Sequence, residues 1–145
     1  MCLKTANASG FVVNEPVECY KMLVEWKDKP GLWSPTYSKR YEIGEAYEEA
    51  ECLMSRSHDG AYTLYHDGFH SCKTLEGVKT YMNEMIMNAD EYSLQMIGRL
   101  VIVRCSICVG AWCVAGEDDS YHVPGYVSSE IKVEEIVEKM EVLCA

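Results

Sequence analysis

The feature that most restricts the fold is the stretch of residues 97–109, IGRLVIVRCSICV, which is dense in β-branched side chains. Such side chains lose freedom in a helix and pack well on a pleated surface. A run of this kind without strict alternation is typical of a strand that is covered on both faces. We therefore predict a long central strand over residues 97–109, and we expect residues 112–115 to pair beside it.

The same stretch contains Cys105 and Cys108, a CxxC pair, and Cys113 follows closely. This spacing occurs in zinc and redox sites. Alternation along a strand, however, places Cys105 and Cys108 on opposite faces, so their thiols diverge. We predict that the cysteines are reduced, that they fill space as small hydrophobic side chains, and that they hold no metal.

Two further elements have clear periodic patterns. Residues Val17–Trp26 alternate apolar and charged side chains, as a half-buried strand requires. Residues Leu75–Asn88 carry apolar side chains at spacings of three and four after Thr74, which predicts a capped helix. Residues 45–54 have a helix-favouring composition and predict a second helix.

The remaining signals predict strands. Short strands are expected on both sides of a turn at His66-Asp67-Gly68, and another begins near Ile131, while residues 134–143 are compatible with strand or helix. Pro124-Gly125 predicts a break. Strands around one main helix predict an α+β fold for residues 1–145, a single domain with a twisted, mainly antiparallel sheet.

The negative net charge of the chain electrostatically disfavours some classes of binding partner. Thirteen Lys and Arg stand against twenty-three Asp and Glu, which gives a formal charge of -10. A chain this acidic repels phosphate backbones and anionic membranes, so direct nucleic-acid or membrane binding is not expected. The start of the chain has no apolar secretory signal, and no apolar run approaches the roughly twenty residues that span a bilayer. We expect a cytoplasmic protein.

Two small motifs remain open as chemical sites. His66 and His70 have metal-ligand spacing, but the Asp67-Gly68 sequence between them favours a turn over a helix. Cys2 would become an N-terminal nucleophile if Met1 were removed, as in class II amidotransferases. The glycine-rich continuation of that family is absent, so we favour structural roles for both motifs.

A third, dispersed set consists of Tyr20 on the first strand, Ser71 before the helix and Glu130 on a late strand. In this order the three residues resemble single-domain ADP-ribosyltransferases. The resemblance implies a nicotinamide dinucleotide (NAD) as cofactor and a glutamate that stabilises an oxocarbenium-like transition state. Neither Arg nor His precedes Tyr20 on the first strand, so the nucleotide-gripping residue of that family is missing.

Three short phrases resemble small uncharacterised proteins of bacteria and their phages. They are MCLK at residues 1–4, SP at 34–35 followed by YEIG at 41–44, and GFH at 68–70 leading to Tyr81. The resemblance implies a phage or mobile-element setting, in which small acidic proteins act by binding a host protein, for example as inhibitors of a defence system. This is the function that we expect first, with an NAD-dependent transferase as the alternative.

Two surfaces are candidates for contact with such a partner. Aromatic residues are common anchors of interfaces, which favours the first surface. One is an aromatic loop and the other is an acidic turn. The residues are Trp33, Pro35 and Tyr37 in the loop, and Glu117, Asp118 and Asp119 in the turn.

Overall fold

The computed structural model describes residues 2–5, 10–35, 39–49, 54–56, 63–65 and 67–142. Within them the chain forms thirteen strands in one sheet and two helices, and every strand pairing is antiparallel. The strands are β1 (Leu3–Thr5), β2 (Phe11–Val12), β3 (Val17–Trp26), β4 (Leu32–Trp33), β5 (Arg40–Tyr41), β6 (Ala46–Glu48), β7 (Met54–Arg56), β8 (Thr63–Tyr65), β9 (Phe69–Cys72), β10 (Ile97–Ile107), β11 (Trp112–Asp118), β12 (Pro124–Ser128) and β13 (Glu130–Glu141).

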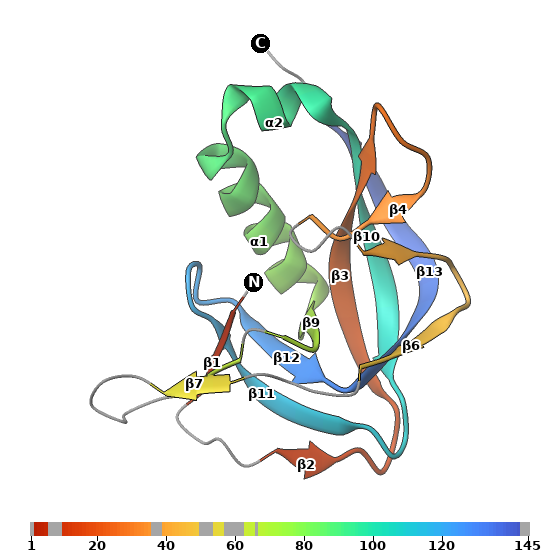
Figure 1. Cartoon of the computed structure of the whole chain (residues 1–145), viewed down its shortest axis with the longest axis vertical. Coiled ribbons are helices and arrows are strands. Elements are labelled where there is room, and N and C mark those ends of the chain that lie inside the picture. Colours follow the sequence, from red (N-terminus) through yellow and green to blue (C-terminus); the bar gives the residue numbers. More distant parts are fainter. Residues whose placement is uncertain are drawn as a thin grey trace.

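The sheet divides into two parts at β3. Its order is β6-β13-β10-β3-β9-β12-β11-β1-β8-β7, with β2 on β11 and the β4–β5 pair attached to β3. Strands β3 and β10 pair along their whole length, whereas β3 and β9 meet only where Tyr20 lies opposite Cys72. Figure 1 shows the long strands β3, β10 and β13 running together, with β9, β12 and β11 turning away below them.

The central strand is buried on both faces, as the sequence predicts. Leu23 and Val101 lie on one face in a core cluster that also contains the cysteines of β3 and β10. Val24 and Leu100 lie on the other face, in the cluster covered by helix α1. The predicted strands Val17–Trp26 and 97–109 are therefore confirmed, the second ending at Ile107.

Helix α1 (Leu75–Asn88) is also confirmed, including its N-cap. The hydroxyl of Thr74 accepts a hydrogen bond from the backbone N–H of Gly77 at 2.9 Å. Its buried residues Val78, Tyr81 and Met82 pack against the sheet. A second helix, α2 (Glu91–Met96), was not expected, since none of its side chains is buried and no apolar stripe marks it. Neither helix in the described part of the chain is long and apolar enough to cross a membrane.

Two predictions about the sheet are wrong. The predicted helix at residues 45–54 is replaced by β6, in which Tyr47 pairs with Ile131 of β13, so sheet pairing outweighs local helix propensity. Residues 50–53 lie outside the described part. Strand β11 does not pair with β10, because both edges of β10 are already occupied by β3 and β13. It pairs instead with β12, β1 and β2.

The second half of the chain is more extended than expected. Residues Glu130–Glu141 form one strand with no helical part. Pro124-Gly125 opens β12 instead of breaking the chain, at the strand-start position where proline is tolerated. The strands on either side of the predicted His66–Gly68 turn form, but they pair with other strands and not with each other. The mainly antiparallel sheet with one main helix is thus confirmed, in a chain richer in strand than we expected.

Candidate functional site

A cavity of about 230 Å³ opens where β3 parts from β9. Its walls come from these two strands, from the first turns of α1, from Asp67 and Gly68 before β9, and from described residues between Ser34 and Glu49. Separation of neighbouring strands creates such spaces, and concave sites of this kind are the usual places for small ligands. The lining residues are Tyr20, Lys21, Met22, Ser34, Pro35, Lys39, Tyr41, Glu49, Asp67, Gly68, Phe69, His70, Ser71, Cys72, Val78 and Tyr81.

Lys21 is the most unusual residue of this cavity. Its ammonium donates a hydrogen bond to the backbone oxygen of His70 and lies 5.5 Å from the centre of the Tyr41 ring. No carboxylate in the described ranges lies within ion-pair distance of it. Burial lowers the pKa of Lys21, and the positive charge of Lys39 lowers it further, against the opposing influence of the nearby thiols.

The position of Lys21 follows from the alternation of β3. Cys19, Lys21 and Leu23 point to the same face, and Cys19 and Leu23 both belong to the core. Across the ladder, Lys21 lies opposite Val103, which is fully buried. The alternating pattern predicts that Lys21, a polar residue between Tyr20 and Met22, faces outward. The sequence therefore does not indicate Lys21 as a site residue. The cysteine two residues before it was the available signal that this face is buried.

A second lysine lies at the cavity, among aromatic rings. The Lys39 ammonium is 4.6 Å from the ring centre of Phe69, 5.4 Å from that of Tyr47 and 6.0 Å from that of Tyr41. Its carboxylate partner is Glu49, with 3.9 Å between Nζ and Oε1. Rings arranged in this way attract cations through their electron-rich faces. Lys39 is therefore held in place while its partner Glu49 remains partly exposed.

The structure brings together two of the three residues expected for ADP-ribosyl transfer. Tyr20 and Ser71 both line the cavity, whereas Glu130 lies on β13 opposite Glu48 and is not part of the lining. The Ser71 hydroxyl is buried and has no hydrogen bond of ordinary geometry among the described groups. It lies close enough to Cys19 to lower the pKa of that thiol, although burial, the larger effect, raises it to about 11.

The cysteines of the central strands belong to the core. Cys19, Cys105 and Cys113 are fully buried in one cluster, and Cys108 is partly exposed beyond the end of β10. Burial raises the pKa of Cys113 to about 12, so this thiol is neutral at ordinary pH. The six cysteines within the described ranges carry free thiols.

The sequence analysis left two motifs open as chemical sites, the His66–His70 pair and Cys2. His70 is buried and lines the cavity, but His66 lies outside the described residues. In the ranges that the structure describes, no three His, Cys, Asp or Glu side chains are grouped to hold a metal ion. Cys2 directly precedes β1, and its carbonyl accepts a hydrogen bond from the Asp119 backbone N–H at 2.9 Å.

The aromatic loop is engaged with the rest of the molecule. Trp33 donates from Nε1 to the Pro30 carbonyl at 2.9 Å, and the Lys29 ammonium lies 4.0 Å from its ring centre. Pro35 lines the cavity, and Tyr37 lies outside the described residues. The loop thus serves in part as a wall of the cavity.

The acidic turn requires a correction. Asp118 is only 2% exposed, and its carboxylate accepts hydrogen bonds from the backbone N–H groups of Ser120 and Tyr121. Its role is to hold this turn, so its selection as a docking residue was wrong. Glu117 contacts Nδ1 of His122 at 3.2 Å, and Asp119 is exposed. Binding of a host protein remains a prediction.

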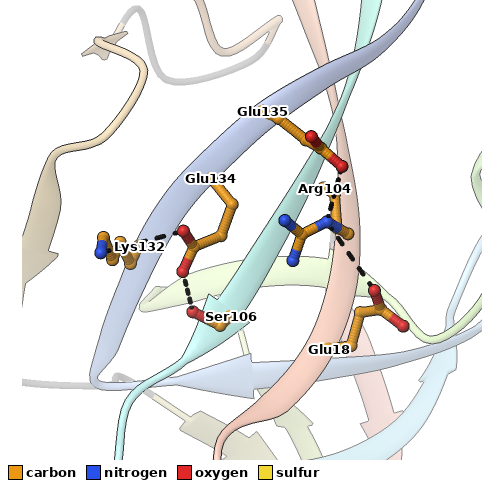
Figure 2. A network of polar contacts seen from close by, with 6 residues as sticks. All are labelled: Glu18, Arg104, Ser106, Lys132, Glu134 and Glu135. Atoms are coloured by element: carbon orange, nitrogen blue, oxygen red, sulfur yellow. Dashed lines mark hydrogen bonds and ion pairs between the residues drawn. The ribbon is translucent and has the colours of Figure 1, made fainter.

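A separate polar network links β3, β10 and β13 (Figure 2). Arg104 bonds to Glu135 at 3.0 Å and lies 3.8 Å from Glu18, and Ser106 donates to Glu134 at 2.7 Å. Exposed pairs of this kind contribute little to stability, so we assign this network to the pairing of the strands.

In comparisons with known proteins, no family model, curated protein or solved structure matches the chain.

Proposed function

We propose that this chain is a binding protein that holds a small organic anion in the cavity between β3 and β9. The observation that carries the proposal is Lys21, a mostly buried amine at the cavity without a carboxylate partner among the described residues. A charge removed from water without a counter-ion is costly. A carboxylate or phosphate that enters the cavity would supply that counter-ion and would be bound in return.

The other lining residues fit a small ligand with an apolar part. The ammonium groups of both lysines lie within 6.0 Å of the centre of the Tyr41 ring. Phe69 and Tyr81 add further aromatic surface. The volume of about 230 Å³ is below the roughly 300–1,000 Å³ of pockets for drug-sized molecules. The preferred ligand is therefore the size of a small metabolite.

Thermal shift measurements with a panel of small carboxylates and phosphate esters test this proposal. A ligand that binds only the folded chain raises its melting temperature by mass action. We expect at least one anion to do so for the native chain, and Lys21→Met to abolish the shift. Lys79→Met is the matched control, because Lys79 lies on α1 and pairs with Glu138 at the surface. The absence of any shift at millimolar ligand, or equal shifts in both variants, would refute the proposal.

ADP-ribosyl transfer is the second candidate function. It is supported by Tyr20 and Ser71, which both line the cavity. The acidic group at the cavity would then be Glu49 in place of the expected Glu130. NAD belongs in the same panel, and release of nicotinamide on incubation separates transfer from binding. Glu49→Gln should stop that release if this second candidate is correct.

A further inference from the structure

The amine of Lys21 is a basic group at the cavity, and its surroundings bear on its reactivity. An amine attacks a carbonyl carbon only in its neutral form, and burial beside a second cation favours that form. Here the second cation is Lys39, whose ammonium faces the same Tyr41 ring as that of Lys21.

The neighbouring thiols support this assignment. Burial raises the pKa of Cys19 to about 11 and that of Cys72 to about 12. Neutral thiols are poor nucleophiles compared with thiolates. Lys39 also lines the cavity but is paired with Glu49, so Lys21 is left as the reactive amine.

We infer that Lys21 forms an imine with the carbonyl carbon of a small 2-oxo acid held in this cavity. The inference rests on the proposed function, since it assigns the class of anion that the cavity binds. In a 2-oxo acid the carboxylate is bonded to the carbonyl carbon, so one ligand reaches both lysines. Lys21 bonds to the carbonyl carbon, and the carboxylate stays beside the Lys21 nitrogen while it also pairs with Lys39. The carboxylate of the ligand competes with Glu49, whose contact with Lys39 is long at 3.9 Å and partly exposed.

The reaction needs no further reagent. The nitrogen lone pair attacks the carbonyl carbon, a C–N bond forms, and the carbonyl electron pair moves to oxygen. A proton passes from nitrogen to that oxygen and gives a carbinolamine. The second nitrogen proton then leaves with the hydroxyl group as water while the C=N bond forms. The amine and the carbonyl compound therefore become an imine and one water molecule.

Reductive trapping tests the inference. The whole protein is incubated at pH 7 with glyoxylate and cyanoborohydride, which reduces imines in preference to carbonyl groups, and every lysine is quantified by peptide mass spectrometry. We expect Lys21 to be modified several times faster than the surface residues Lys79 and Lys132, because a lowered pKa leaves more of its amine neutral at pH 7. Unfolding in urea should remove the difference. Equal rates in the folded protein would overturn the inference.

Two controls separate this inference from the proposed function. Glycolate has the carboxylate of glyoxylate without its carbonyl group, so a glycolate-induced thermal shift without Lys21 trapping would overturn the imine and leave anion binding intact. Failure of both ligands to bind would overturn the imine, and failure of the whole panel of anions would refute the proposed function as well. Lys39→Gln should slow trapping by glyoxylate more than trapping by acetaldehyde, which has no carboxylate and so loses only the effect of Lys39 on the pKa of Lys21. Equal slowing of both would contradict the assigned role of Lys39.

Discussion

Tyr20 lies opposite Cys72, and among the described residues this is the one register pair that joins β3 to β9. On one side of this pair the sheet continues through β10 and β13, and on the other through β12 and β11. The strands separate on leaving the pair, and the space between them is the cavity that Lys21 lines. The candidate site is thus a consequence of sheet topology.

The first prediction concerns Lys21→Met. Replacing a poorly compensated buried charge with an apolar side chain of similar length should raise the free energy of unfolding at pH 7 by about 1–4 kcal/mol. Burial lowers the pKa of Lys21 in the folded chain below its ordinary value of 10.5. At pH values between the lowered pKa and 10.5, the unfolded chain therefore binds more protons than the folded chain. The native chain therefore gains stability as the pH rises through this window.

The difference in unfolding free energy between Lys21→Met and the native chain should accordingly be greatest at low pH and should vanish above pH 10.5. Urea unfolding of both proteins at several pH values measures this difference. Lys79→Met should show no such trend. A pH-independent difference between the native chain and Lys21→Met would contradict the account.

Thr74→Ala should cost about 1 kcal/mol of unfolding free energy, because it removes the hydroxyl that accepts the Gly77 N–H at the start of α1. Thr74→Ser retains the acceptor and should cost much less. Urea unfolding followed by circular dichroism measures both. Equal losses in the two variants would indicate that packing, and not capping, explains the role of Thr74.

Gly125→Val should disturb the site through the backbone of β9. A Cβ atom at residue 125 would lie 2.4 Å from the Ser71 carbonyl oxygen, so β9 must move. Strain of this kind costs about 1–3 kcal/mol, and we expect the ligand-induced thermal shift to fall as well. Ala115→Val, on the exposed side of the neighbouring strand β11, is the control. An unchanged thermal shift in Gly125→Val would show that the position of β9 does not control binding.

Arg104→Ala should reduce stability only slightly, and less than Thr74→Ala, because the contacts of Arg104 with Glu135 and Glu18 are exposed to water. The loss should diminish in high salt, which screens exposed charges. Unfolding at two salt concentrations measures it. A large loss that salt does not change would give this network a greater role than strand pairing.

The sequence predicts those elements whose signals are local. Strand β3, the central strand β10 and helix α1 with its Thr74 cap all follow from periodicity, β-branching and capping within a few residues. The strand at Tyr47 was predicted as helix, because its pairing partner Ile131 lies more than eighty residues away in the chain. Local propensity contains no information about such a partner.

The candidate site was predicted in part for the same reason. The sequence indicates Tyr20 and Ser71 as candidate catalytic residues, and both line the cavity. Lys21 was not selected, because its burial depends on the packing of Tyr41 and Phe69 over β3. Lysine is ordinarily an exposed residue, so only the three-dimensional arrangement reveals an amine on the core face.

The most direct test of the central claim is the pKa of the Lys21 amine, measured by nuclear magnetic resonance on lysine-labelled protein with Lys21→Arg for assignment. The account predicts a value well below 10.5 in the free chain, and a rise on addition of a bound carboxylate that carries no carbonyl group. A value near 10.5 that no anion changes would contradict it.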